Sequence, residues 1–191
     1  MKQTAKMLKK PVFGLLLAAS MMMQAQEQVG IIPKPVELKM GVGHFLIDGN
    51  TAIKYNPAQK ELKATANFFI SYIKNISGVV LATNKSSKKE IQFILDKDIP
   101  EEGYKLDVSP NAIVIKASSS KGIFYGMQSI FQTLPAIRTN AALEVPVMQA
   151  VDYPRFKWRG MHLDVSRHFF GPEMVKEYID LMASYKINVF H

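Results

Sequence analysis

The sequence predicts a mixed α/β and α+β chain, in which a small α+β domain over residues 31–149 precedes a strand–helix–strand unit over residues 151–191. In the first region, short strand-like segments alternate with two segments of helical periodicity. In the second region, two apolar strands flank one amphipathic helix, and neighbouring strands joined by a helix run parallel through a crossover. A leader over residues 1–25 comes before both regions.

The leader has the layout of a secretory signal peptide. Four lysines and no acidic residue lie in its first ten positions, an apolar stretch follows over residues 11–23, and the small residue Ala25 ends it. A membrane anchor is the alternative, but about a dozen apolar residues are too few to cross ~30 Å of hydrocarbon as a helix. We therefore expect cleavage after Ala25 and export to the periplasm, or to the extracellular space or cell surface, with no membrane attachment afterwards.

Composition excludes several classes of protein and of site. The leader removes four of the 24 basic residues and none of the 16 acidic ones, so the formal net charge falls from +8 to +4. That charge gives no case for nucleic-acid binding. The absence of cysteine excludes disulfides, zinc–thiolate sites and thiol catalysis. The four histidines show no metal-binding spacing, so we expect no metal and no cofactor.

Residues 31–149 are expected to form an α+β sandwich. Apolar residues recur at spacings of three and four from Pro57 to Gly78 and again from Ser118 to Pro135, which predicts two helices. Two helices on one face of locally paired strands make a sandwich of two layers. The expected strands are residues 44–48, 51–55, 91–95, 104–108 and 112–116, the last two forming an antiparallel hairpin.

Residues 151–191 show a different pattern. Strands are expected over Gly160–Val165 and Ile187–Phe190, with a helix that begins at Gly171-Pro172 and is closed by Tyr185-Lys186. One such unit cannot bury both faces of its sheet. The side of the helix expected to be buried carries Met174, Val175, Tyr178, Ile179 and Met182.

The densest group of polar residues among apolar ones runs from Asp152 to His168. Asp164 lies near the end of the first expected strand, with Arg167 just beyond it, and His191 ends the second strand. In barrels built of alternating strands and helices, the carboxyl ends of the strands face the active site. Arg167, His168 and His191 follow two neighbouring strands, so they are expected on one rim of such a barrel. The planar fork of an arginine can donate two hydrogen bonds to adjacent sugar hydroxyls. A structural salt bridge from Arg167 to Asp164 or Asp152 is the competing interpretation.

Other polar and aromatic residues in these segments suit structural roles. Trp158 could stack on a sugar ring, but its place before the first strand favours closing the junction between the two regions. We expect structural pairing for Arg155 and Arg159, and surface or satisfied core positions for His44 and His162.

An ordered series of motifs over the last 40 residues resembles β-N-acetylhexosaminidases of glycoside hydrolase family 20. The preceding region is similar to the N-terminal domain of that family, through Pro33-Lys-Pro35, Gly103-Tyr104 and the segment 122–128. The motifs are Asp152-Tyr-Pro-Arg-Phe156, Trp158-Arg-Gly160, Leu163-Asp164, Ser166-Arg-His-Phe169 and Lys186-x-Asn-x-Phe-His191.

The resemblance implies a non-catalytic α+β domain packed on the start of a (β/α)8 TIM barrel. It also implies removal of terminal β-linked N-acetylglucosamine or N-acetylgalactosamine from glycans by substrate-assisted catalysis. In that mechanism the acetamide oxygen of the sugar attacks the anomeric carbon, an Asp orients the acetamide, and an adjacent Glu protonates the leaving oxygen. Arg167 would hold hydroxyls of the terminal sugar, with Asp152 and His191 as supporting substrate-binding residues.

The chain departs from the family pattern in one respect. It contains no Asp-Glu dipeptide and ends at the second expected strand, so we assign no catalytic residue and expect a truncated barrel that is inactive alone. Two alternatives stay open. One is a hexosaminidase of another family that shares the N-terminal domain, and the other is a non-catalytic carbohydrate-binding or interaction module.

Overall fold

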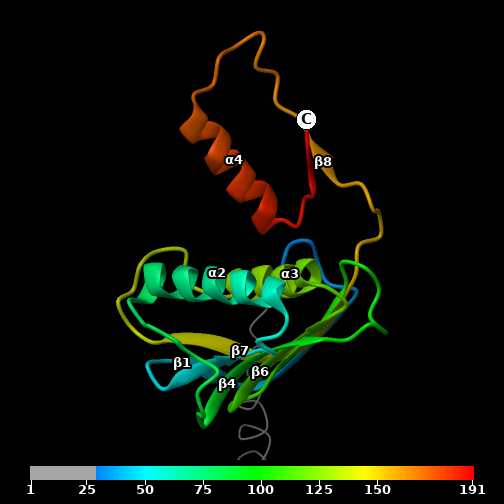
Figure 1. Ribbon diagram of the computed structural model, residues 1–191. Helices are drawn as coiled ribbons and strands as arrows, with labels where there is room; N and C mark the ends of the chain where they lie inside the picture. The colour runs from blue at the N-terminus through cyan, green and yellow to red at the C-terminus, as the bar shows by residue number, and fades with distance from the viewer. Residues whose placement is uncertain (1–28) are drawn as a thin grey trace, which may run out of the picture.

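The computed structural model describes residues 29–191 and shows two parts joined by one linker (Figure 1). The larger part is a seven-stranded sheet with helices α2 and α3 on one of its faces. The smaller part is a strand–helix–strand unit that lies above those helices in Figure 1. The predicted signal peptide, residues 1–25, lies outside the described residues.

The large sheet is mixed, with the strand order β1-β7-β5-β6-β4-β2-β3. The predicted hairpin of β5 and β6 is confirmed, but the expectation that all strands pair locally is wrong. Helix α2 carries the chain from β2 across to β3 and β4, and strands joined by such a crossover run parallel. The strands are β1 (Glu37–Ile47), β2 (Thr51–Lys54), β3 (Ala82–Thr83), β4 (Lys89–Leu95), β5 (Tyr104–Val108), β6 (Ala112–Ala117) and β7 (Leu143–Asp152).

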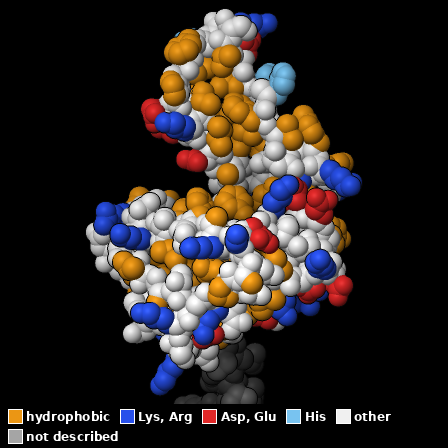
Figure 2. Space-filling view, in the orientation of Figure 1, with side chains coloured by type: hydrophobic (Ala, Val, Ile, Leu, Met, Phe, Trp, Pro, Cys, Tyr) orange, Lys and Arg blue, Asp and Glu red, His pale blue; other side chains and the backbone are white. Residues whose placement is uncertain are grey.

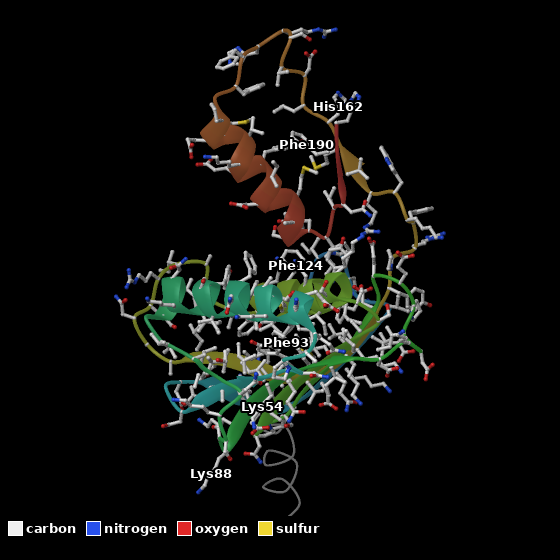
Figure 3. The ribbon with its side chains drawn as sticks, viewed as in Figure 1. Lys54, Lys88, Phe93, Phe124, His162 and Phe190 are labelled. Atoms are coloured by element: carbon white, nitrogen blue, oxygen red, sulfur yellow. The ribbon has the colours of Figure 1, made fainter. Side chains whose placement is uncertain are left out.

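Helix α2, Lys60–Ser77, confirms the first predicted helix and covers the middle of the sheet. Leu62, Ala66, Phe69 and Ile73 of its apolar stripe are fully buried, and the ring of Phe69 meets that of Phe93 on β4 edge-on, with 6.0 Å between the ring centres. Figure 3 shows Phe93 between the helices and the sheet. Gly78 ends the helix in a left-handed conformation, φ 74°, and its N–H donates to Lys74 O at 2.8 Å.

Helix α3, Ser120–Phe131, confirms the second predicted helix and approaches the sheet closely, because two of its residues lack a side chain. A Cβ atom at Gly122 would overlap Gly103 O and lie 2.7 Å from Ala117 Cβ. A Cβ atom at Gly126 would lie 2.6 Å from a side-chain carbon of β6. These two positions, one helical turn apart, let the backbone of α3 rest directly on the ends of β5 and β6.

The longest strand pair of the sheet, β1 with β7, joins segments about 100 residues apart in the chain. The sequence pattern predicted only part of β1 and none of β7, which contains Pro146. That proline lies opposite His44, where the register shifts between Met40 and His44. A proline is tolerated there, since a bulge already interrupts the ladder of hydrogen bonds.

The smaller part contains β8 (Gly160–Met161), α4 (Pro172–Ser184) and β9 (Val189–Phe190). β8 and β9 pair in parallel, which confirms the predicted crossover, although both strands are shorter than expected. On α4 only Met182 is buried. The prediction that Met174, Val175, Tyr178 and Ile179 are buried is therefore wrong for the described residues. Figure 2 shows hydrophobic side chains gathered on this unit.

An ion pair near the edge of the sheet predicts a measurable pH dependence. Lys89 Nζ lies 2.8 Å from Asp48 Oδ2, and this hydrogen bond lowers the pKa of Asp48 below its ordinary value of 3.8. A carboxyl pKa lowered by folding adds stability above the ordinary pKa, and this stability is lost as the pH falls through the folded-state pKa. We expect Lys89→Met to lower the free energy of unfolding by about 0.5–1 kcal/mol at pH 7.

Urea unfolding at a series of pH values checks this prediction. The difference between the wild type and Lys89→Met should narrow as the pH falls below 3.8. Lys88→Met is the matched control, because Lys88 is exposed and has no acidic partner among the described residues. A difference that stays constant down to the acid transition would contradict the role of the pair.

Candidate functional site

The carboxyl ends of β8 and β9 form one rim at the far end of the smaller part. His191 N–H donates to Met161 O at 3.0 Å, and Leu163 N–H donates to His191 O at 2.9 Å, so the two strand ends are tied together. Figure 3 shows His162 and Phe190 at this end, away from the seven-stranded sheet. The residues that follow the strands, including Arg167 and the exposed His191, belong to the same end of the unit.

A tight turn after β8 fixes the start of the loop that carries Arg167. One carboxylate oxygen of Asp164 accepts hydrogen bonds from Ser166 Oγ at 2.9 Å, Ser166 N–H at 3.0 Å and Arg167 N–H at 3.2 Å. This turn takes residues 164 and 165 out of the predicted strand 160–165, and β8 itself ends at Met161. The hydrogen bond from the Ser166 hydroxyl, and to a smaller extent those from the two backbone N–H groups, hold the pKa of Asp164 below its usual range. The carboxylate is therefore ionised at neutral pH.

Arg167 combines both interpretations that the sequence left open. Its Nε lies 3.3 Å from Asp164 Oδ2, which is the expected salt bridge, yet 91% of its side chain is exposed. The two terminal amino groups of the guanidinium have no partner within residues 29–191. The side chain is therefore tethered at one nitrogen and can still donate hydrogen bonds from the other two. His168, next in sequence, packs its ring at 4.8 Å from that of Phe170.

Asp152 lies in the larger part, at the junction and away from the end of the smaller part that carries Arg167 and His191. It ends β7, and its Oδ2 accepts a hydrogen bond from Lys186 Nζ at 2.8 Å. Lys186 comes before β9, whereas His191 follows it. The structure thus brings Arg167 and His191 to one end and does not bring Asp152 there.

The junction between the two parts is held by a buried polar cluster. Lys186 Nζ also donates to the hydroxyl of Tyr104 at 2.9 Å, and that hydroxyl lies 2.6 Å from Ser129 Oγ. Burial lowers the pKa of Lys186 and raises the pKa of Tyr104, in each case by penalising the charged form. The pairing with Asp152 counteracts this loss of hydration for the lysine.

Arg159 makes the second set of contacts across the junction. Its Nη2 donates to Glu102 Oε2 at 2.8 Å and to the hydroxyl of Tyr125 at 3.1 Å, and its Nη1 donates to Phe156 O at 2.8 Å. Its Nε donates to Lys186 O at 2.8 Å and so joins the two ion pairs. The predicted structural pairing of Arg159 is confirmed.

The structural roles predicted for Arg155 and Trp158, which precede β8, are not confirmed. Arg155 lies 5.5 Å from the ring centre of Phe156 and has no carboxylate partner among residues 29–191. Trp158 does not close the junction within the described residues, because it is 69% exposed. Its ring instead rests on Gly160, where a Cβ atom would lie 2.6 Å from the indole.

A cavity of about 390 Å³ opens at the junction, beside the linker 153–156. Tyr104 and Tyr125 line it together with both ion pairs. Each buried charge on its wall already has an oppositely charged partner, so none is available as a catalytic acid or base. The junction therefore holds the two parts together, and the rim carries the accessible polar groups.

The sequence pattern missed the role of Lys186, which it treated as the end of a helix. A lysine between Tyr185 and Ile187, in an otherwise apolar stretch, was the available signal. Among residues 29–191, no group of three acidic or histidine side chains could hold a metal ion. In the same residues, no helix is both long and apolar enough to cross a membrane.

Comparisons with known proteins divide the chain near the linker. Residues 28–153 match the sequence profile described as glycosyl hydrolase family 20, domain 2, and residues 156–191 match that described as glycosyl hydrolase family 20, catalytic domain. A β-hexosaminidase of Porphyromonas gingivalis is 34% identical over 85% of this chain and 22% of its own. A β-N-acetylhexosaminidase of Cellulomonas fimi is 32% identical over 85% of this chain and 34% of its own.

Solved structures show the same likeness. The family 20 β-N-acetylhexosaminidase from Streptomyces coelicolor superimposes with a TM-score of 0.77 at 30% identity, over 84% of this chain and 34% of its own. An exo-β-N-acetylglucosaminidase from Vibrio harveyi, solved in complex with N-acetylglucosamine, gives 0.72 at 32% identity, over 84% of this chain and 24% of its own. The chain thus spans between a fifth and about a third of the length of these relatives.

Proposed function

Because this chain belongs to glycosyl hydrolase family 20, we propose that residues 156–191 are part of the catalytic domain of an exo-β-N-acetylhexosaminidase. The substrate is a glycan that ends in β-linked N-acetylglucosamine or N-acetylgalactosamine. The complex of the Vibrio relative with N-acetylglucosamine supports this class of substrate. The observation that carries the proposal is the rim, where an exposed arginine is tethered by an ionised carboxylate just beyond a parallel strand.

The parallel β8–α4–β9 unit has the geometry of one repeat of a (β/α)8 barrel, and we propose that it begins such a barrel. In that arrangement Arg167 and His191 face the substrate. The amino groups of Arg167 that lack a partner in the described chain donate to hydroxyls of the terminal sugar. The tether to Asp164 limits the orientations open to the guanidinium, so less conformational entropy is lost when the sugar binds.

Hydrolysis follows the substrate-assisted route in this proposal. The acetamide oxygen attacks the anomeric carbon, the glycosidic bond breaks, and a carboxylic acid gives its proton to the leaving oxygen. Asp164 is unsuited to donate that proton, because its lowered pKa keeps it ionised at neutral pH. Asp152 is occupied by Lys186 at the junction. We therefore propose that these 191 residues position the sugar and that the proton donor is supplied by another part of the enzyme.

The glycan is the partner that this proposal requires. Export through the predicted leader would place the enzyme in the periplasm, at the cell surface or outside the cell, where glycans are accessible. Mass spectrometry of the exported protein should then find its N-terminus at Gln26, immediately after the expected cleavage site.

Three chromogenic substrates test the proposed activity on the protein purified from its complete gene. We expect hydrolysis of the 4-nitrophenyl β-glycosides of N-acetylglucosamine and N-acetylgalactosamine, and none of 4-nitrophenyl β-glucoside, which lacks the acetamide. Equal hydrolysis of all three would overturn the substrate-assisted route. Failure to cleave either N-acetylated substrate would overturn the proposed activity.

A further inference from the structure

Four residues other than glycine have a left-handed backbone within residues 29–191. Two of them, Asn84 and Asn140, are of a type that tolerates this conformation. The other two, Glu102 and Lys186, have long charged side chains, and φ is 60° at both. The backbone alone disfavours such residues, which suggests that their side chains are retained for the contacts they make.

Both exceptional residues are members of the two ion pairs that cross the junction. Glu102 pairs with Arg159 at 2.8 Å, and Lys186 pairs with Asp152 at 2.8 Å. Both acids belong to the larger part and both cations to the smaller part. The exposed fractions of the four side chains lie between 7% and 18%, so removing one partner leaves a buried charge without compensation.

The two cations hold the beginnings of the two short strands. Arg159 immediately precedes β8, and its carbonyl oxygen accepts the N–H of Asn188 at 3.0 Å and of Val189 at 3.2 Å. Lys186 lies three residues before β9, and its own carbonyl accepts from Arg159 Nε at 2.8 Å. Lys186 and His191 are separated by only five peptide bonds, so a shift of the backbone at Lys186 is transmitted to His191 on the rim.

We propose that Lys186 is a positioning residue, through which the seven-stranded sheet fixes the start of β9 and thereby the place of His191 on the rim. This inference rests on the proposed function for its consequence in catalysis. It assigns a task to the non-catalytic sheet domain, which is to set the register of the first two strands of the catalytic domain. The competing view is that Lys186 only closes the turn after α4, a position that glycine occupies most readily.

Substitution of Lys186 by glycine separates the two views, because it relieves the left-handed backbone and removes the ammonium group. In the 191-residue chain we expect Lys186→Gly to speed hydrogen exchange at least tenfold at the amides of Val189 and His191. These amides donate to Arg159 O and Met161 O respectively. Amides of α2 and α3 should keep their protection. Exchange that stays unchanged or becomes slower would overturn the positioning role.

Three further variants complete the exchange experiment. Lys186→Arg keeps a donor for Asp152 and should restore most of the protection. Lys176→Met is the matched control on α4, since its ion pair with Glu173 is exposed, and it should leave exchange at β9 unchanged. If Lys186→Gly also unprotects α2 and α3, Asp152→Asn decides instead. Normal protection of β9 in Asp152→Asn would then overturn the proposal.

Activity provides a second, separate readout on the protein purified from its complete gene. We expect Lys186→Gly to lower kcat/KM at least tenfold at a temperature where it stays folded, and Lys186→Arg to recover most of that loss. A wild type that cleaves no N-acetylhexosaminide would overturn the proposed function and leave the exchange result standing. An active wild type with unchanged kcat/KM in Lys186→Gly would overturn the role of Lys186 in positioning the rim.

Discussion

If the proposed function holds, replacing Arg167 with lysine in the protein purified from its complete gene is expected to lower kcat/KM for a terminal N-acetylhexosaminide at least tenfold, while the melting temperature stays nearly unchanged. A lysine keeps the charge but loses the planar fork that donates to two neighbouring hydroxyls. A charged hydrogen bond contributes about 1.5–3 kcal/mol, which corresponds to roughly 10- to 150-fold in rate or affinity. The melting temperature should stay near the wild-type value, because the ion pair with Asp164 is exposed to solvent and such pairs add little to stability.

Arg155→Lys is the matched control for this measurement. Arg155 is also exposed and lacks a carboxylate partner among the described residues, but it lies in the linker at the opposite end of the unit. Its replacement should leave both kcat/KM and the melting temperature near the wild-type values. A lower melting temperature for Arg167→Lys, with normal activity of the folded enzyme, would instead make Arg167 a structural residue.

The replacement Gly122→Val is expected to lower the free energy of unfolding of the sheet domain strongly. The added Cβ atom would overlap Gly103 O and approach Ala117 Cβ to 2.7 Å, and neither atom belongs to a flexible side chain. Helix α3 must therefore move away from the sheet. Overpacking of this kind costs about 1–3 kcal/mol, occasionally more. Valine is chosen over alanine because replacing glycine with alanine stabilises a helix by about 1 kcal/mol, which would offset part of the expected loss. The β-branched valine has a lower helix propensity than alanine, so this offset is smaller.

Urea unfolding of Gly122→Val beside Lys121→Val measures this effect. Lys121 is the neighbouring residue on the same helix and is exposed, so its replacement should change the free energy of unfolding by no more than about 0.5 kcal/mol. Equal stability of the two variants would show that α3 can adjust its distance from the sheet at little cost.

Features set by local spacing could be predicted from the sequence. Helices α2, α3 and α4 follow from apolar residues at spacings of three and four, and the hairpin of β5 and β6 follows from alternation about a turn. Strand β7 could not be predicted in this way. Its partners β1 and β5 are distant in sequence, and Pro146 weakens its local strand signal.

In the candidate site, too, positions that depend on local sequence could be predicted, whereas contacts between distant residues could not. Arg167 and His191 were placed at one end of the unit by chain direction alone, since parallel strands end at the same edge. The partner of Asp152 could not be predicted, because Lys186 lies 34 residues away and meets it only when the two parts dock. The exposure of Trp158 was also unpredictable, since an entry segment gives no periodic pattern from which burial can be inferred.

The pairing of β1 with β7 sets the order in which the domain can be completed during synthesis. Strand β1 is at the edge of the sheet, and within residues 29–191 it pairs with β7 alone, so this pairing cannot form until residues 143–152 have been made. The other five strands and both helices of this part are synthesised earlier and can pack before then. The last strand ends at Asp152, four residues before the catalytic-domain match begins. In a nascent chain the sheet, including Asp152, which pairs with Lys186, is therefore complete in sequence just before β8 is synthesised.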